Sequence, residues 1–305
     1  MLDDQRVEVQ EYGKTIDDLR ALERYLAGLG IHKEFDRLGR YIKDIERLDK
    51  AVQAGNVSDL IARSSTRELA VSLHEGMILA EVAEHLKRID PGKLVPILRA
   101  VLKGHPDPAA EKSTQGKNKA RNVLFHLQVG AKFHKHGAKV WYPERLEDNP
   151  DVLAIRDSRK ILTECKRPDS QSTIESNIAE AARQLTDELN ARDDPHARGV
   201  IAISIARVLN PSHEVLDCTG RSGFGVVETR VSEIASSCKP HFRKILDTRI
   251  IGVLFHWATP VQIGRHPGLV IAQQIEAHAL GVAGWADARL LSDALGQARH
   301  DVPRF

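Results

Sequence analysis

Apolar residues recur at every third or fourth position along the first third of the chain. This spacing places an apolar stripe along one side of an α-helix. Between Thr15 and about Gly104, no stretch alternates apolar and polar residues as a strand does. The pattern therefore predicts an all-helical N-terminal region, with its helices in residues 16–30, 35–55 and 65–89.

A polar stretch interrupts this pattern at residues 104–120, "GHPDPAAEKSTQGKNKA". Pro, Gly, Lys and small polar residues dominate it, which is typical of a linker or an exposed loop. We therefore expect a domain boundary here, with a helical region in residues 1–112 and a second domain in residues 113–305.

The period changes after this boundary. A helix, three short strands, a second helix and a further strand are expected in turn. This order predicts an α/β fold, with a mixed central sheet flanked by helices. Beyond it we expect a charged helix, a very apolar strand and a C-terminal helix. The core elements are expected at residues 118–136, 138–143, 151–157, 160–167, 174–189 and 199–209, and the later ones at 228–247, 249–258 and after Gly284, with Trp141, Tyr142 and Trp257 as core residues.

Composition narrows the class of protein only moderately. The chain has 305 residues and a formal net charge of +2, so charge alone does not indicate nucleic-acid binding. Its three cysteines are far apart and odd in number, which argues against a disulfide framework and favours a reducing cytoplasm. The polar N-terminus and the absence of a long uncharged apolar run predict a protein that is neither secreted nor membrane-inserted.

Two of the predicted strands carry charges where buried strands normally carry apolar residues. They lie in "NPDVLAIRDSRKILTECKRPDS", residues 149–170. A hairpin turn at residues 157–158 places Asp151 opposite Glu164. Side chains alternate along a strand, so Lys166 projects on the same face as Glu164. The pattern thus predicts two facing carboxylates with a lysine beside them.

Facing carboxylates destabilise a sheet unless a positive charge lies between them. Converging oxygen ligands with an open side are what Mg²⁺ or Mn²⁺ requires, and the backbone carbonyl of Cys165 can add a third. Such an ion, held by Asp151 and Glu164, polarises a phosphate oxygen and activates water, while Lys166 stabilises negative charge. The arrangement indicates phosphodiester hydrolysis. The alternative is an edge hairpin with an ordinary surface ion pair.

The cysteine and histidine residues give little further indication of a site. Cys165 is expected to be a packed core thiol. His126, His134 and His136 do not share one helical face and have no cysteine near them in the sequence, so we do not expect a zinc site.

The Pro150-Asp151 pair and the later Glu164-Cys165-Lys166 string, with the order of elements around them, resemble the PD-(D/E)xK nuclease superfamily. The resemblance implies a restriction-endonuclease-like fold and a Mg²⁺-dependent DNA endonuclease in restriction, defence or repair. It also implies a catalytic role for Gln184, because a glutamine in the helix after the lysine strand often lines the site in this family.

One departure from the family keeps alternatives open. Many members carry a glutamate in the first core helix, whereas this chain has no acidic residue between Lys112 and Glu144. Gln128 lies on the flank where that residue is expected. A catalytically impaired nuclease-fold protein that binds nucleic acid or acts as a scaffold is therefore a second hypothesis. A nuclease that acts on RNA is a third.

Basic residues next to the first core helix suggest where nucleic acid binds. Lys117, Lys119 and Arg121 lie at its N-terminal end, where helix amides add to the positive field, and we group Gln128 with them. The same lysines also suit a simple soluble linker. Because cleavage usually needs two strands to be cut, we expect a homodimer, with the helical region serving dimerisation, regulation or substrate positioning.

Overall fold

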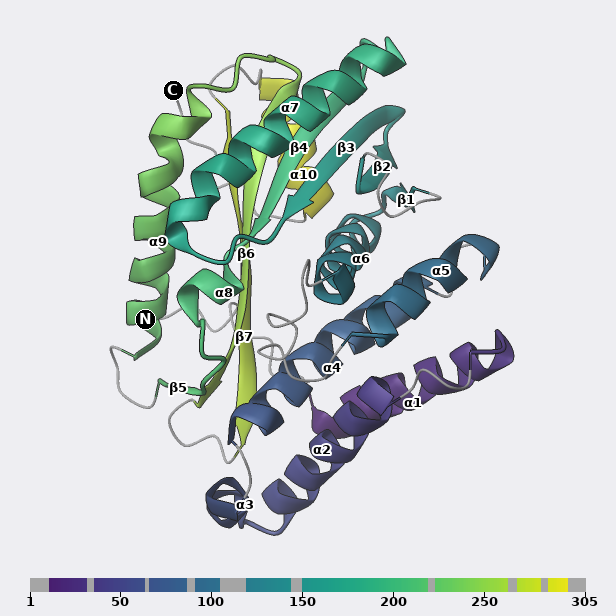
Figure 1. Cartoon of the computed structure of the whole chain (residues 1–305), viewed down its shortest axis with the longest axis vertical. Helices are drawn as coiled ribbons and strands as arrows, with labels where there is room; N and C mark the ends of the chain where they lie inside the picture. The colour runs from purple at the N-terminus through teal and green to yellow at the C-terminus, as the bar shows by residue number, and fades with distance from the viewer. Residues whose placement is uncertain are drawn as a thin grey trace. The chain divides into compact units, whose positions relative to one another are not determined.

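A computed structural model of the chain is shown in Figure 1. The chain forms two compact units, and each is made of segments that are distant in sequence. The first contains residues 1–124, 210–229 and 258–274, and the second contains residues 125–209, 230–257 and 275–305. The structure describes residues 11–31, 36–63, 66–86, 91–104, 119–143, 150–218, 223–262, 268–280 and 285–295.

The first unit contains the expected N-terminal helical region. Its long helices pack together through their apolar stripes, as shown by Leu19, Leu22 and Leu26, which are at most 1% exposed. The helices are α1 (Tyr12–Gly28), α2 (Asp36–Gln53), α3 (Val57–Arg63), α4 (Thr66–Leu86) and α5 (Pro91–Leu102). The short helix α3 was not expected from the sequence.

A buried charge cluster joins the helices of this unit. The Glu75 carboxylate on α4 accepts hydrogen bonds from Arg37, Tyr41 and Arg121. Arg37 is 1% exposed and also donates to the carbonyl of Val101 over 2.7 Å. Burial alone raises the pKa of Glu75, but the two guanidinium charges outweigh it and lower that pKa well below its usual range. The cluster therefore keeps a fully buried glutamate ionised.

Removing this carboxylate should destabilise the protein strongly. A Glu75→Gln variant leaves two buried guanidinium groups without their counter-charge, and we expect a loss of about 3–5 kcal/mol in the free energy of unfolding. Urea unfolding followed by circular dichroism measures it. The control is Arg20→Ala, which removes an exposed ion pair with Glu46 and should cost less than about 1 kcal/mol. Equal losses in the two variants would contradict a special role for the cluster.

The second unit has the α/β order expected from the sequence. Strands β1, β2 and β3 are antiparallel neighbours, and β3, β4 and β6 are parallel neighbours, so the sheet is mixed. The elements are α6 (Lys119–Lys135), whose residues up to Leu124 belong to the first unit, β1 (Lys139–Trp141), β2 (Val152–Arg156), β3 (Arg159–Lys166), the short turn Gln171–Thr173, α7 (Ile174–Arg192), β4 (Ala197–Ser204) and α8 (Ala206–Leu209).

The C-terminal part completes the sheet and its helical cover. Helix α9 (Gly223–Phe242) begins earlier than its expected start at Glu228, and β7 (Leu269–Ala279), which pairs with β6, was not expected. The other elements are β5 (Leu216–Asp217), β6 (Ile250–Gln262) and the expected C-terminal helix α10 (Trp285–Leu295). No described helix is long and apolar enough to cross a membrane.

Strand β3 presents different side chains to the helices on the two faces of the sheet. Ile161 and Cys165 belong to a buried cluster with apolar residues of α6 and α10. The alternate residues face α7, which packs along β3 and β4 (Figure 1). Because each face is covered by its own helices, polar residues of β3 are held in place on both sides of the sheet.

Trp141 departs from the expected core. Its neighbour Tyr142 packs against the buried cluster, and Trp257 is 1% exposed, as expected. Trp141 is instead 40% exposed because it ends β1, which is an edge strand of the described sheet. An edge strand lacks a neighbour on one side, so its large side chains are covered less completely.

Candidate active site

The β2–β3 hairpin has the register predicted from the sequence. Asp157 and Ser158 form its turn with φ values of 48° and 63°, as a two-residue hairpin turn with two left-handed positions requires. Val152 pairs with Thr163, and the pairing continues without a shift to the turn. Asp151 immediately precedes this ladder, so extending the register places it beside Glu164.

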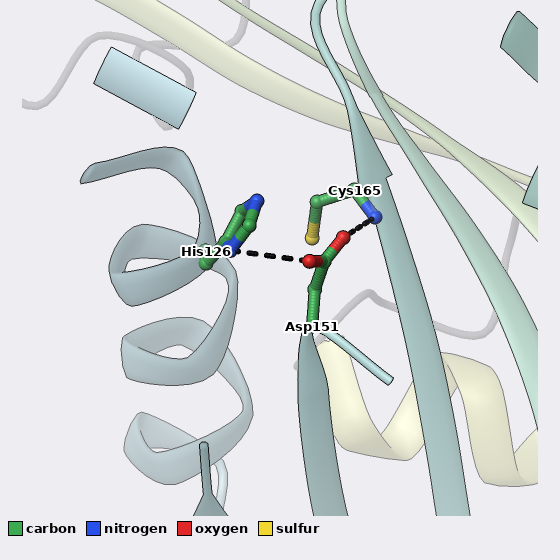
Figure 2. A group of neighbouring side chains, drawn as sticks. All are labelled: His126, Asp151 and Cys165. Atoms are coloured by element: carbon green, nitrogen blue, oxygen red, sulfur yellow. Dashed lines mark hydrogen bonds and ion pairs between the residues drawn. The ribbon is translucent and has the colours of Figure 1, made fainter. Parts of the chain in front are cut away.

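The carboxylate of Asp151 is held from two directions (Figure 2). Its Oδ2 accepts a hydrogen bond of 2.8 Å from the backbone N–H of Cys165. Its Oδ1 lies 3.4 Å from Nδ1 of His126 on α6. With its side chain only 13% exposed, Asp151 is oriented by β3 and α6 together.

Glu164 is buried beside Asp151, and one of its two carboxylate oxygens is unpaired within the described part of the chain. It is 1% exposed, and its Oε1 has no hydrogen-bond partner among the described residues. Burial raises the pKa of Glu164 to about 8. The Asp151 charge and a hydrogen bond with Asp151 add to this rise, while the Lys166 charge opposes it. Buried polar atoms are nearly always paired in folded proteins. An unpaired carboxylate oxygen next to a second carboxylate is therefore the structural feature that a bound cation would satisfy.

Lys166 and Gln184 meet on the α7 side of β3. The ammonium group of Lys166 donates to Oε1 of Gln184 over 2.5 Å and to Oε1 of Glu180 over 3.2 Å. The Lys166 side chain is 15% exposed. The structure thus gathers Asp151, Glu164, Lys166 and Gln184 in one place, and it adds Glu180, which the sequence did not indicate.

The backbone of Cys165 faces the Asp151 side of the strand. Its N–H points to Asp151. In an extended strand the N–H and C=O groups of one residue point to the same side. The Cys165 carbonyl is therefore directed to the same side as Asp151, as a metal ligand of the predicted kind needs to be.

His126 is the site residue that sequence reasoning missed. The sequence pattern relates it only to zinc, together with His134 and His136. Burial lowers the pKa of His126 and thus favours the neutral imidazole. The Asp151 charge acts in the opposite direction but is the smaller effect. The position of His126 in the sequence could have indicated this role. His126 shares a helical face with Val129 and Phe133, which pack on the sheet. A polar residue within such an apolar stripe needs a buried partner.

Of the four residues expected to contact nucleic acid, the structure describes the side chains of two. Lys117 lies outside the described residues, and of Lys119 only the backbone, at the start of α6, is described. Arg121 is 4% exposed and pairs with Glu75, and Gln128 is 2% exposed. Neither of these two side chains forms part of an exposed surface, because both are buried. We therefore assign them no contact with nucleic acid.

Comparison with protein-family models, with curated proteins and with solved structures gives no significant match. The chemical interpretation of the site therefore rests on its residues and their geometry.

The raised pKa of Glu164 makes a prediction about stability and pH. In the metal-free protein the folded state keeps a proton that the unfolded state releases, so stability should fall as pH rises from about 5 to about 8. The expected fall is on the order of 2–4 kcal/mol, since one pKa unit corresponds to about 1.4 kcal/mol. Urea unfolding in EDTA at several pH values measures it.

Two additions sharpen this experiment. Glu164→Gln cannot ionise, so its stability should change much less over the same pH range, whereas Glu180→Gln, at a 55% exposed side chain, should behave like the wild type. Saturating Mg²⁺ should restore stability at the alkaline end because it binds the ionised carboxylates. A wild-type pH profile parallel to that of Glu164→Gln would contradict the assignment.

Proposed function

We propose that the chain is a metal-dependent nuclease of the PD-(D/E)xK type with a restriction-endonuclease-like fold, and that it hydrolyses phosphodiester bonds of DNA. One observation carries the proposal. The buried, unpartnered Oε1 of Glu164 lies beside the Asp151 carboxylate, with Lys166 held next to them. The order of helix α6, three antiparallel strands, helix α7 and parallel strand β4 supports it.

The residues fit a hard divalent cation. Asp151, Glu164 and the carbonyl of Cys165 offer oxygen ligands, which Mg²⁺ and Mn²⁺ prefer. The cation also removes the repulsion between two carboxylates that are both poorly exposed. When bound, it supplies polarisation of a phosphate oxygen and a lowered pKa for a bound water.

The protein side chains have separate roles in this proposal. Lys166, whose charge lowers the pKa of the neighbouring Glu164, stabilises negative charge that develops on the phosphate. Gln184 is a positioning residue, because it accepts a hydrogen bond from Lys166 and limits where the ammonium group can lie. His126 similarly orients Asp151 from the opposite side.

An exposed aromatic ring supports a nucleic-acid substrate. Trp141 pairs with Leu153, and Leu153 pairs with Leu162, so the three side chains project on one face of the sheet. Leu162 precedes Glu164 by two residues and therefore shares its face. The indole of Trp141 thus lies on the face that carries the carboxylates, where a base next to the cleaved phosphate can stack on it.

Substitution of Lys166 tests the catalytic assignment. Lys166→Ala should lower the rate of plasmid cleavage with Mg²⁺ or Mn²⁺ by roughly 100-fold or more, the usual effect of removing a group that stabilises the transition state. Lys160→Ala is the matched control, because Lys160 lies on the same strand and face but pairs with Asp194. The control should cleave within about twofold of the wild type.

The same assay separates the alternative functions. Cleavage of RNA but not DNA would change the substrate and leave the site intact. Binding of DNA without cleavage under either metal would favour a catalytically impaired scaffold, in line with the missing acidic residue in α6. Equal cleavage by wild type and Lys166→Ala would refute the site assignment.

Substitution of Trp141 tests substrate contact without turnover. Base–aromatic stacking is worth about 1–3 kcal/mol, so Trp141→Ala should weaken oligonucleotide binding by roughly 5-fold to 150-fold. Trp141→Phe should retain most of the affinity. Fluorescence anisotropy with a labelled single-stranded oligonucleotide in Ca²⁺ measures it. Leu246→Ala, at an 87% exposed apolar residue of the same unit, is the control and should bind normally.

A further inference from the structure

Three side chains of different chemistry converge on the α6 side of strand β3. An imidazole nitrogen of His126, a carboxylate oxygen of Asp151 and the Sγ atom of Cys165 all lie within 4.8 Å of one another. Figure 2 shows the Cys165 thiol directed toward the space between the other two groups. They come from helix α6, from the residue preceding β2 and from β3, so the fold brings them together rather than local sequence.

This group is distinct from the oxygen ligands on the other face. Glu164 and Cys165 are adjacent in β3, so their side chains project to opposite faces of the sheet. Asp151 lies at the end of the neighbouring strand, where its carboxylate is close to both. One carboxylate therefore belongs to two possible ligand sets, one with oxygens alone and one with nitrogen, oxygen and sulfur.

We propose that His126, Asp151 and Cys165 form a second metal site, selective for a thiophilic divalent cation with the coordination chemistry of Zn²⁺. Nitrogen, oxygen and thiolate ligands are those that Zn²⁺ takes, and three protein ligands leave a fourth position open. Mg²⁺ and Mn²⁺ disfavour sulfur. On binding, the thiol of Cys165 releases its proton to solvent, and the thiolate forms the bond to the metal.

The three ligand side chains are largely buried. Cys165 is 6% exposed, and the side chains of His126 and Asp151 are 12% and 13% exposed. The ligands are thus mostly shielded from bulk water, and each keeps a small exposed fraction. The Cys165 N–H bond to Asp151 and the packing of α6 hold them in place before any metal binds.

Sharing of Asp151 gives the site a regulatory consequence, which rests on the proposed nuclease function. A thiophilic cation that takes the Asp151 carboxylate removes one ligand from the Mg²⁺ site. Binding of Zn²⁺ should therefore inhibit cleavage. The binding itself requires no catalytic activity and can be tested separately.

Titration of the metal-free full-length protein with Co²⁺ tests the site directly. A Co²⁺–thiolate bond gives a near-ultraviolet charge-transfer band, and we expect this band to saturate at one equivalent and to disappear when Zn²⁺ displaces Co²⁺. Cys165→Ser should abolish the band. Cys238→Ser, at another buried cysteine of the same unit, should retain it. A band that is absent in the wild type, or that survives in Cys165→Ser, would overturn the proposal.

Two further variants define the ligand set. His126→Asn should weaken Co²⁺ binding by at least about tenfold, as expected when a nitrogen ligand is lost. Glu164→Gln should retain the band, because Glu164 belongs only to the oxygen site. Loss of the band in folded Glu164→Gln, or unchanged affinity in His126→Asn, would refute this ligand set. Circular dichroism confirms that each variant is folded.

Inhibition is tested last, in the presence of excess Mg²⁺. Cys165→Ser should require at least about tenfold more Zn²⁺ than the wild type for half-inhibition of cleavage. Equal sensitivity of the two proteins would contradict the shared-ligand inference. If the wild type does not cleave nucleic acid, the nuclease proposal fails, whereas the Co²⁺ titration still decides whether the metal site exists.

Discussion

The hydrogen bond from the Cys165 amide to the Asp151 carboxylate is the contact on which the site depends. It extends the β2–β3 pairing by one step beyond the end of β2, with a side-chain oxygen in place of a backbone acceptor. The carboxylate is thereby held at the sheet rather than turned to solvent. Glu164 on one face and His126 from the other side can then both approach it.

Each unit contains a buried glutamate, and the two differ in how far neighbouring groups compensate the negative charge. Glu75 in the first unit has two guanidinium groups and a hydroxyl around it, so its charge is fully compensated by the protein. Glu164 in the second unit has one lysine nearby, shared with Gln184 and Glu180, and a second carboxylate next to it. Burial of an uncompensated charge is costly. The charge of Glu75 is therefore balanced by protein groups alone, whereas Glu164 needs a bound proton or a cation to balance its charge.

Alternation along β3 accounts for the two proposed metal preferences. Even-numbered residues of this strand face α7 and provide the carboxylate and ammonium groups. Odd-numbered residues face α6 and provide a thiol close to an imidazole. Asp151 serves both faces because it lies at a strand end, where the side chain is not confined to one side of the sheet. Competition between hard and thiophilic cations follows from this position.

The sequence by itself determined the hairpin, its register and the order of elements around it, because strand periodicity and a two-residue turn are local properties. Only the tertiary structure decided the partners of His126 and Arg121. Each depends on how α6 is rotated about its axis, and Arg121 meets Glu75 from 46 residues away. Trp141 was exposed by its place on an edge strand, since strand order is set by long-range pairing that local periodicity does not encode.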